Sequence, residues 1–164
     1  MVAWVIAGGQ TMADWSRGRG LLGPLKPLLG DWATEPGGEG ESPAGPMRCT
    51  RSFREFGKGW IELDARWEMG ARGTYREIAL FGPTGDGALG FFSFTNDGKR
   101  SEGRLASGDD VHPQAIAFEA QMPAGLARML YWPAGEGAGF CFAVESRTKK
   151  GWNRFLRHVY RPRS

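Results

Sequence analysis

The clearest pattern in the chain is an alternation of apolar and polar residues over positions 60–69. Every second residue of this range is apolar: Ile61, Leu63, Ala65, Trp67 and Met69. The residues between them are Glu62, Asp64, Arg66 and Glu68. Successive side chains of a strand point to opposite faces of the sheet, so a period of two predicts a strand with one buried and one solvated face.

Further segments of strand length follow one another to the C-terminus, separated by turns rich in Gly, Pro, Asp and Asn. A first strand begins at Trp32, and Gly57-Lys58-Gly59 predicts a tight hairpin. The other predicted strands are 47–56, 60–69, 74–81, 89–95, 99–106, 116–122, 127–132, 139–147 and 152–161. Short connections and almost no helix predict an all-β fold, a single up-and-down antiparallel β-barrel of about eight to ten strands.

One helical pattern precedes these strands. Leucines recur at spacings of three and four between Gly20 and Leu29, but Pro24 and Pro27 interrupt them. This pattern predicts a short helix or 3-10 turn that covers one mouth of the barrel. We expect residues 1–19 to be a flexible N-terminal extension, within which Met12 is an alternative start, and residues 20–164 to form the barrel domain. Residues 37–46 are expected to form an exposed loop.

Composition agrees with one folded domain. The 164 residues are 41% hydrophobic and 12% aromatic, and the 26 Gly and 10 Pro are scattered between apolar runs, as turns between strands require. The net charge is +3, and basic residues gather in the range 147–163, interleaved with aromatic ones. No nucleic-acid motif accompanies them, so we interpret them as solvated residues on the outer face of the last strand and predict no nucleic-acid partner. An alternative is an interaction module that uses Arg157, Arg161 and Arg163.

The two cysteines, Cys49 and Cys141, have no metal-binding spacing and are expected to be small buried residues. The apolar start, Met1 to Ile6, is too short for a signal sequence or a membrane span. We therefore expect a cytoplasmic protein without a membrane partner, either a monomer or a homodimer.

The aromatic content exceeds what a minimal barrel core needs, which favours a lumen lined by aromatic side chains with a few polar anchors. Glu77 lies on a strand with two apolar faces, so its carboxylate is a candidate for the lumen, with Arg128 or Arg154 as partner for a ligand's polar group. The predicted ligand-binding residues are Trp67, Tyr75, Glu77, Phe92, Phe94, Phe118, Arg128, Phe142, Arg154 and His158.

Two short motifs resemble the calycin superfamily, which includes lipocalins, fatty-acid-binding proteins and nitrobindins. They are Gly30-Asp31-Trp32 at the first strand and the arginines of the last strand. The ending 152–160 and the segment 94–103 are also similar to uncharacterised bacterial lipocalin-like domains. The resemblance implies that Gly30 and Trp32 close one end of the barrel under a basic side chain, Arg157 or Arg154. It also implies a ligand in the lumen.

Nitrobindins bind haem in such a barrel, which makes haem an alternative ligand. In this chain the residues after Trp32 contain glycines without the regular spacing of that group. Haem would need a neutral imidazole that reaches the iron, and His158 is the candidate because His112 precedes a proline in a turn.

We therefore expect non-enzymatic binding of a small, largely apolar ligand with a polar or acidic head, and no metal. An enzyme that acts on such a ligand through Glu77 or His158 is a further alternative. The chain has no nucleophile elbow, phosphate-binding loop or zinc-protease motif to support it.

Overall fold

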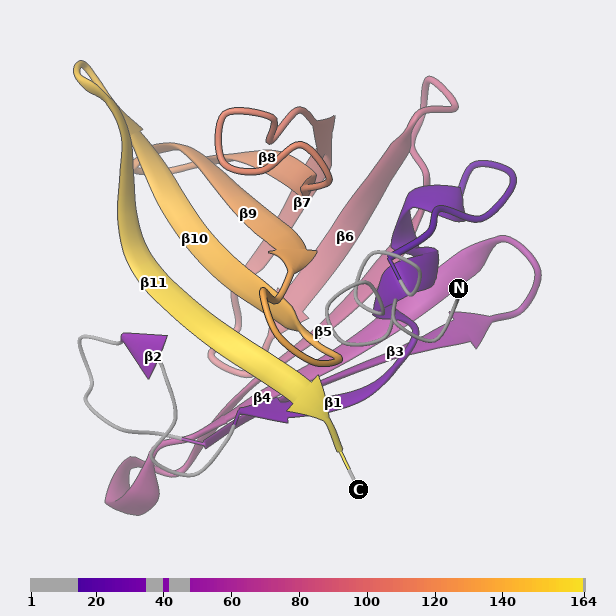
Figure 1. Ribbon diagram of the computed structural model, residues 1–164. Coiled ribbons are helices and arrows are strands. Elements are labelled where there is room, and N and C mark those ends of the chain that lie inside the picture. The colour runs from indigo at the N-terminus through magenta and orange to yellow at the C-terminus, as the bar shows by residue number, and fades with distance from the viewer. Residues whose placement is uncertain (1–14, 35–39, 42–47, 164) are drawn as a thin grey trace.

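The computed structural model describes residues 15–34, 40–41 and 48–163, and within them the chain forms a β-barrel (Figure 1). The predicted fold class is confirmed: the strands are antiparallel and follow one another up and down. The described residues contain no α-helix, only the 3-10 segments η2 (Gly23–Leu28) and η3 (Gly70–Arg72). Residues 1–14 of the expected extension, and most of the expected loop at 37–46, lie outside the described residues.

In the described part of the chain eleven strands make up the sheet, and all but β2 form the closed barrel. Their order is β1-β3-β4-β5-β6-β7-β8-β9-β10-β11, and β1 pairs with β11 to close the sheet on itself. Their bounds are β1 (Gly30–Thr34), β2 (Gly40–Glu41), β3 (Arg48–Phe56), β4 (Trp60–Glu68), β5 (Thr74–Pro83), β6 (Leu89–Thr95), β7 (Arg100–Ala106), β8 (Ile116–Met122), β9 (Gly125–Pro133), β10 (Phe140–Thr148) and β11 (Gly151–Pro162). The short β2 pairs with β11 beyond the end of β1.

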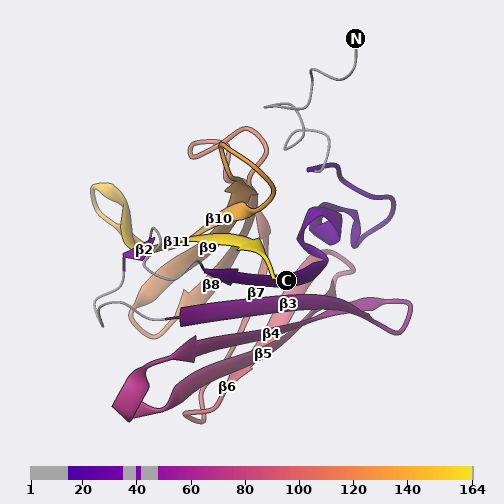
Figure 2. The same cartoon turned by 60° about the horizontal axis from the view of Figure 1, so that its bottom comes forward.

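The 3-10 segment η2 lies at one end of the barrel, as the leucine and proline pattern predicted (Figures 1 and 2). Leu25 and Leu28 of this segment are fully buried in the core. Trp15 is also a core residue, and its indole N–H donates to the carbonyl of Gln114 at 2.9 Å. Packing of the barrel domain therefore begins before Gly20.

The inner face of the barrel near η2 is filled with aromatic side chains. Phe140 is fully buried and stacks on Tyr160 with ring centroids 5.2 Å apart, while Phe81 packs edge-on against Phe118 at 5.0 Å. Because these rings fill the half of the lumen near η2, space for a ligand lies in the half at the opposite end of the barrel. No helix among the described residues is long and apolar enough to cross a membrane.

Candidate functional site

A cavity of about 450 Å³ opens at the end of the barrel opposite η2. Its wall is mostly apolar and is built from the inward faces of β4, β5, β6, β8, β9 and β10. The large apolar side chains that line it are Trp67, Tyr75, Phe91, Phe118, Met129, Phe142 and Val144. An apolar concave site of this size suits a small ligand that is mostly hydrocarbon or aromatic.

The cavity wall also contains one carboxylate, on the inward face of β5. Glu77 lines the cavity, and the hydroxyl of Ser93 on the neighbouring strand β6 donates a hydrogen bond to its Oε2. The two residues are close because Ala79 pairs with Ser93 and Glu77 pairs with Thr95 in the ladder between these strands. A hydrogen-bonded carboxylate in an apolar wall is a polar anchor with a fixed orientation.

An arginine lies behind the inner wall of this cavity. Arg51 of β3 is completely buried, and its guanidinium carbon lies 4.0 Å from the ring centroid of Phe142 and 5.8 Å from that of Trp67. Its Nη2 donates to the hydroxyl of Tyr131 at 2.7 Å, but Nε and Nη1 have no hydrogen-bond partner among the described residues. No ion pair joins Arg51 to a carboxylate in the described part of the chain.

Four polar groups around Arg51 are neutral at physiological pH. Burial raises the pKa of Tyr131 to about 12 and that of the Cys49 thiol to about 11, and it also raises the pKa of Tyr160. Burial, together with the charge of Arg51, lowers the pKa of His158 to about 4. The guanidinium is therefore a buried positive charge that forms no ion pair among the described residues, and the carboxylate of Glu77 is the negative charge that acts on it from a distance. A buried charge is costly unless negative charge compensates for it.

Several residues that the sequence predicted for the lumen line this one cavity. They are Trp67, Tyr75, Glu77, Phe118 and Phe142. They come from β4, β5, β8 and β10 and meet because the alternation along each strand turns them all inward. Their contact with a ligand stays a prediction.

Phe92 and Phe94 were predicted for the lumen, but the structure places them on the outer face of β6. The inward residues of this strand are Phe91 and Ser93. Phe92 packs against Trp60 with ring centroids 6.3 Å apart, and Phe94 is 55% exposed. The run Phe91-Phe92-Ser93-Phe94 is apolar on both faces, so its periodicity does not define the inward side.

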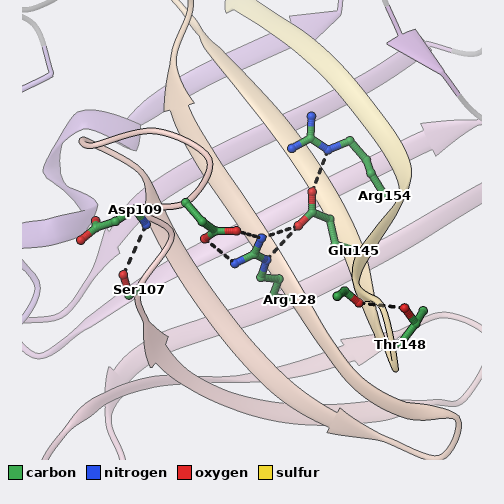
Figure 3. A network of polar contacts seen from close by, with 8 residues as sticks. Ser107, Asp109, Arg128, Glu145, Thr148 and Arg154 are labelled. Atoms are coloured by element: carbon green, nitrogen blue, oxygen red, sulfur yellow. Dashed lines mark hydrogen bonds and ion pairs between the residues drawn. The ribbon is translucent and has the colours of Figure 1, made fainter.

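Arg128 and Arg154 were expected to hold a ligand head in the lumen, but their guanidinium groups lie on the outer face (Figure 3). Arg128 is among the residues that line the cavity, and its side chain binds Asp110 and Glu145 at 2.7 Å each. Arg154 binds the other oxygen of Glu145 at 2.8 Å. Arg128 pairs with Glu119 and Glu145 across the ladders, so these three side chains share the face opposite to Met129.

Trp32 was expected to close one end of the barrel under a basic side chain, but in the structure it packs against an aromatic residue. Gly30 has a φ of +129°, which favours glycine, and the Trp32 indole N–H donates to the carbonyl of Leu28 at 2.7 Å. The ring of Trp32 packs edge-on against Phe140 with centroids 5.0 Å apart. Arg157 pairs with Ala143 and Glu41, away from Trp32, and its Nη2 lies 3.7 Å from Cys141 Sγ. The ring of Phe140 therefore packs on Trp32 in the place where the resemblance implied a basic side chain such as that of Arg157.

His158 points into the barrel but does not line the cavity. It is 2% exposed, and its ring centroid lies 6.0 Å from that of Tyr160. The predicted axial ligand for a haem was the imidazole of His158, which would have to reach the iron from the cavity wall. The buried position of His158 outside the cavity lining does not fit this role.

The buried imidazole predicts a specific pH dependence of stability. The pKa of His158 is about 4 in the folded protein and near 6.5 in an unfolded chain, so only the unfolded chain gains this proton as the pH falls below 6.5. Stability is fully present above pH 6.5 and is lost toward pH 4. We expect the free energy of unfolding to fall by about 2 kcal/mol between pH 7 and pH 5, measured by urea denaturation. In His158→Gln this part of the pH dependence should disappear, and an unchanged slope would contradict the assignment.

Sequence analysis did not identify Arg51, although a signal for it was present. Cys49, Arg51 and Phe53 alternate with polar residues, and all three are buried. An arginine between two apolar residues of one strand face indicates a buried cation, whereas Arg128 and Arg154 lie on strands with several possible inward faces.

Comparisons with known proteins show a similarity of fold to a solved structure. No family model matches the sequence, and no curated protein matches it. Among solved structures, the crystal structure of Rv2717c from M. tuberculosis superposes with a TM-score of 0.56 at 16% sequence identity. The match covers 89% of this chain and 99% of Rv2717c. At this identity the comparison supports the barrel fold alone.

Proposed function

We propose that the protein binds a small, largely apolar ligand with a polar or acidic head inside the barrel lumen. The observation that carries this proposal is the apolar cavity of about 450 Å³ with the buried guanidinium of Arg51 behind its inner wall. The apolar body would contact Trp67, Phe118 and Phe142, and the head would lie at the inner end.

The positive charge of Arg51 favours a ligand whose polar head is negatively charged. Across a site with an effective dielectric constant of about 20, two opposite charges about 7 Å apart attract each other by about 2 kcal/mol. The carboxylate of Glu77 acts in the opposite direction on an anion. The head therefore fits best on the side of Phe142 away from Glu77.

The protein is proposed to be a calycin-like, cytoplasmic binding protein. The barrel architecture with a GxW opening and a 3-10 segment over one end supports the first part. Cys49 and Cys141 form no disulfide with each other, which agrees with the second part.

Native mass spectrometry of gently purified protein tests the proposal directly. We expect a co-purifying small molecule, or else an increase in melting temperature with acidic amphiphiles that grows with their concentration. The control is Val144→Arg, which places a charged side chain in the cavity and should abolish both effects. Binding that survives in this variant, or no stabilisation by any amphiphile, would contradict the proposal.

A further inference from the structure

The barrel wall has an interruption in its hydrogen-bond ladder between β7 and β8. These strands pair at only three positions, Arg104↔Glu119, Leu105↔Phe118 and Ala106↔Ala117. On their other sides both strands remain paired farther toward the open end, β7 with β6 as far as Arg100 and β8 with β9 as far as Met122. The described ladder therefore ends at Arg104 and Glu119. The backbones still touch at Gly103, where a Cβ would lie 2.5 Å from the carbonyl oxygen of Glu119, so the ladder is split only over residues 100–102 and 120–122, toward the open end of the barrel.

A groove of about 1140 Å³ lies along the outer surface of this split. It shares four residues with the lumen cavity, which are Arg100, Ser101, Ala120 and Leu126. We call these four residues the lateral opening. No ladder pair of the described strands joins β7 and β8 at Arg100, Ser101 or Ala120, and the lumen cavity and the groove meet at these residues.

The surroundings of the lateral opening suit an amphiphilic acid. Phe94 and Leu105 line the groove and are 55% and 39% exposed, and Met122 at the cavity rim is 36% exposed. Exposed large apolar side chains that gather at one place indicate a binding surface. The exposed Arg100 adds a positive charge to the same edge.

We propose that the lateral opening is the entrance of the lumen for small amphiphilic acids, which enter between β7 and β8. This inference rests on the proposed function and adds the route and the charge selectivity of that site. Passage requires rotation of the Ser101 and Leu126 side chains but breaks no hydrogen bond of the barrel ladder. Side-chain rotations are fast motions, so the entrance can open without unfolding of a strand. Arg100 attracts the acidic head before the apolar body enters.

Stopped-flow fluorescence with anilinonaphthalenesulfonate, an aromatic sulfonate, tests this route. In Leu126→Trp the larger side chain obstructs the lateral opening, and we expect association and dissociation to slow together by about 5- to 20-fold with little change in Kd. The matched control is Phe155→Trp, because Phe155 lines the cavity but not the groove. Slowing in Phe155→Trp with normal rates in Leu126→Trp would overturn the lateral route in favour of the open mouth.

Charge reversal tests the second part of the inference. In Arg100→Glu we expect the association rate of the sulfonate to fall by about 3- to 10-fold at low salt and to lose most of its salt dependence. The control is Lys149→Glu, a reversal of charge in the β10–β11 turn away from the groove. Equal effects of the two reversals would overturn the assignment to Arg100. Failure of the wild-type protein to bind the sulfonate at all would instead refute the proposed function, and the route with it.

Discussion

Replacement of Arg51 by methionine is expected to weaken the binding of an acidic amphiphile by about 10- to 100-fold while leaving the fold intact. Most substitutions of a fully buried large residue instead cause a large loss of stability. The difference arises because Arg51 carries a charge that no ion pair compensates among the described residues.

Two opposing contributions set the stability of Arg51→Met. The variant loses the hydrogen bond to Tyr131 and the stacking of the guanidinium on Phe142, which each contribute about 1–2 kcal/mol. It also no longer buries a charge, and replacing buried charged residues by apolar ones of similar volume is often neutral or stabilising by about 1–4 kcal/mol. We therefore expect the free energy of unfolding to stay within about 1 kcal/mol of wild type.

Titration calorimetry with anilinonaphthalenesulfonate, together with urea denaturation, measures both effects. The matched variant is Glu77→Gln, which removes the negative charge of the cavity wall and keeps a side chain of the same size. We expect it to bind the sulfonate more tightly than wild type, so that the two variants move the affinity in opposite directions. Equal weakening by both substitutions, or a loss of about 3 kcal/mol of stability in Arg51→Met, would show that the guanidinium serves the core and not the ligand.

The fold could be predicted from the sequence because each strand is marked by its own local pattern. The ranges 89–95 and 116–122 were predicted with the bounds that β6 and β8 have in the structure. Gly and Pro bracketed the range 127–132, which has helical spacing of its apolar residues, and β9 indeed occupies Gly125–Pro133. Turn residues give this information locally, without knowledge of tertiary contacts.

The candidate site could be predicted only in part, because the inward face of a strand is a tertiary property. Glu77 was identified from its own strand, whose two faces are both apolar. In β6 the same ambiguity gave the wrong face, since Phe92 packs outside against Trp60. The outer faces of β9 and β10 are covered by the β7–β8 connection through Asp110, so Arg128 and Glu145 are buried outside the lumen. The rule that alternation separates core from solvent assumes that the outer face of a strand is exposed, so it does not predict residues that are buried on that face.

Truncation of Phe140 to alanine is expected to cost about 3–5 kcal/mol of stability, the largest effect of any single substitution considered for the closed end of the barrel. Phe140 is fully buried and contacts the rings of Trp15, Trp32, Tyr131 and Tyr160 at centroid distances of 5.0–6.4 Å. It opens β10 and pairs there with Tyr160 of β11, the strand that closes the barrel on β1.

The loss expected in Phe140→Ala concerns the closure of the barrel as well as its core, because the ring joins three separate parts of the chain. Trp15 precedes η2, Trp32 belongs to β1, and Tyr160 lies near the end of β11, so the cavity would weaken the closure of the sheet as well as its packing. Chemical denaturation followed by near-ultraviolet circular dichroism measures the effect through these same aromatic rings. The control is Phe94→Ala, since Phe94 is 55% exposed and its truncation should cost less than about 0.5 kcal/mol. Arg157→Ala completes the comparison: if the basic side chain and not the aromatic ring closed the barrel, its loss would equal that of Phe140→Ala, whereas the packing of Trp32 on Phe140 predicts a much smaller effect.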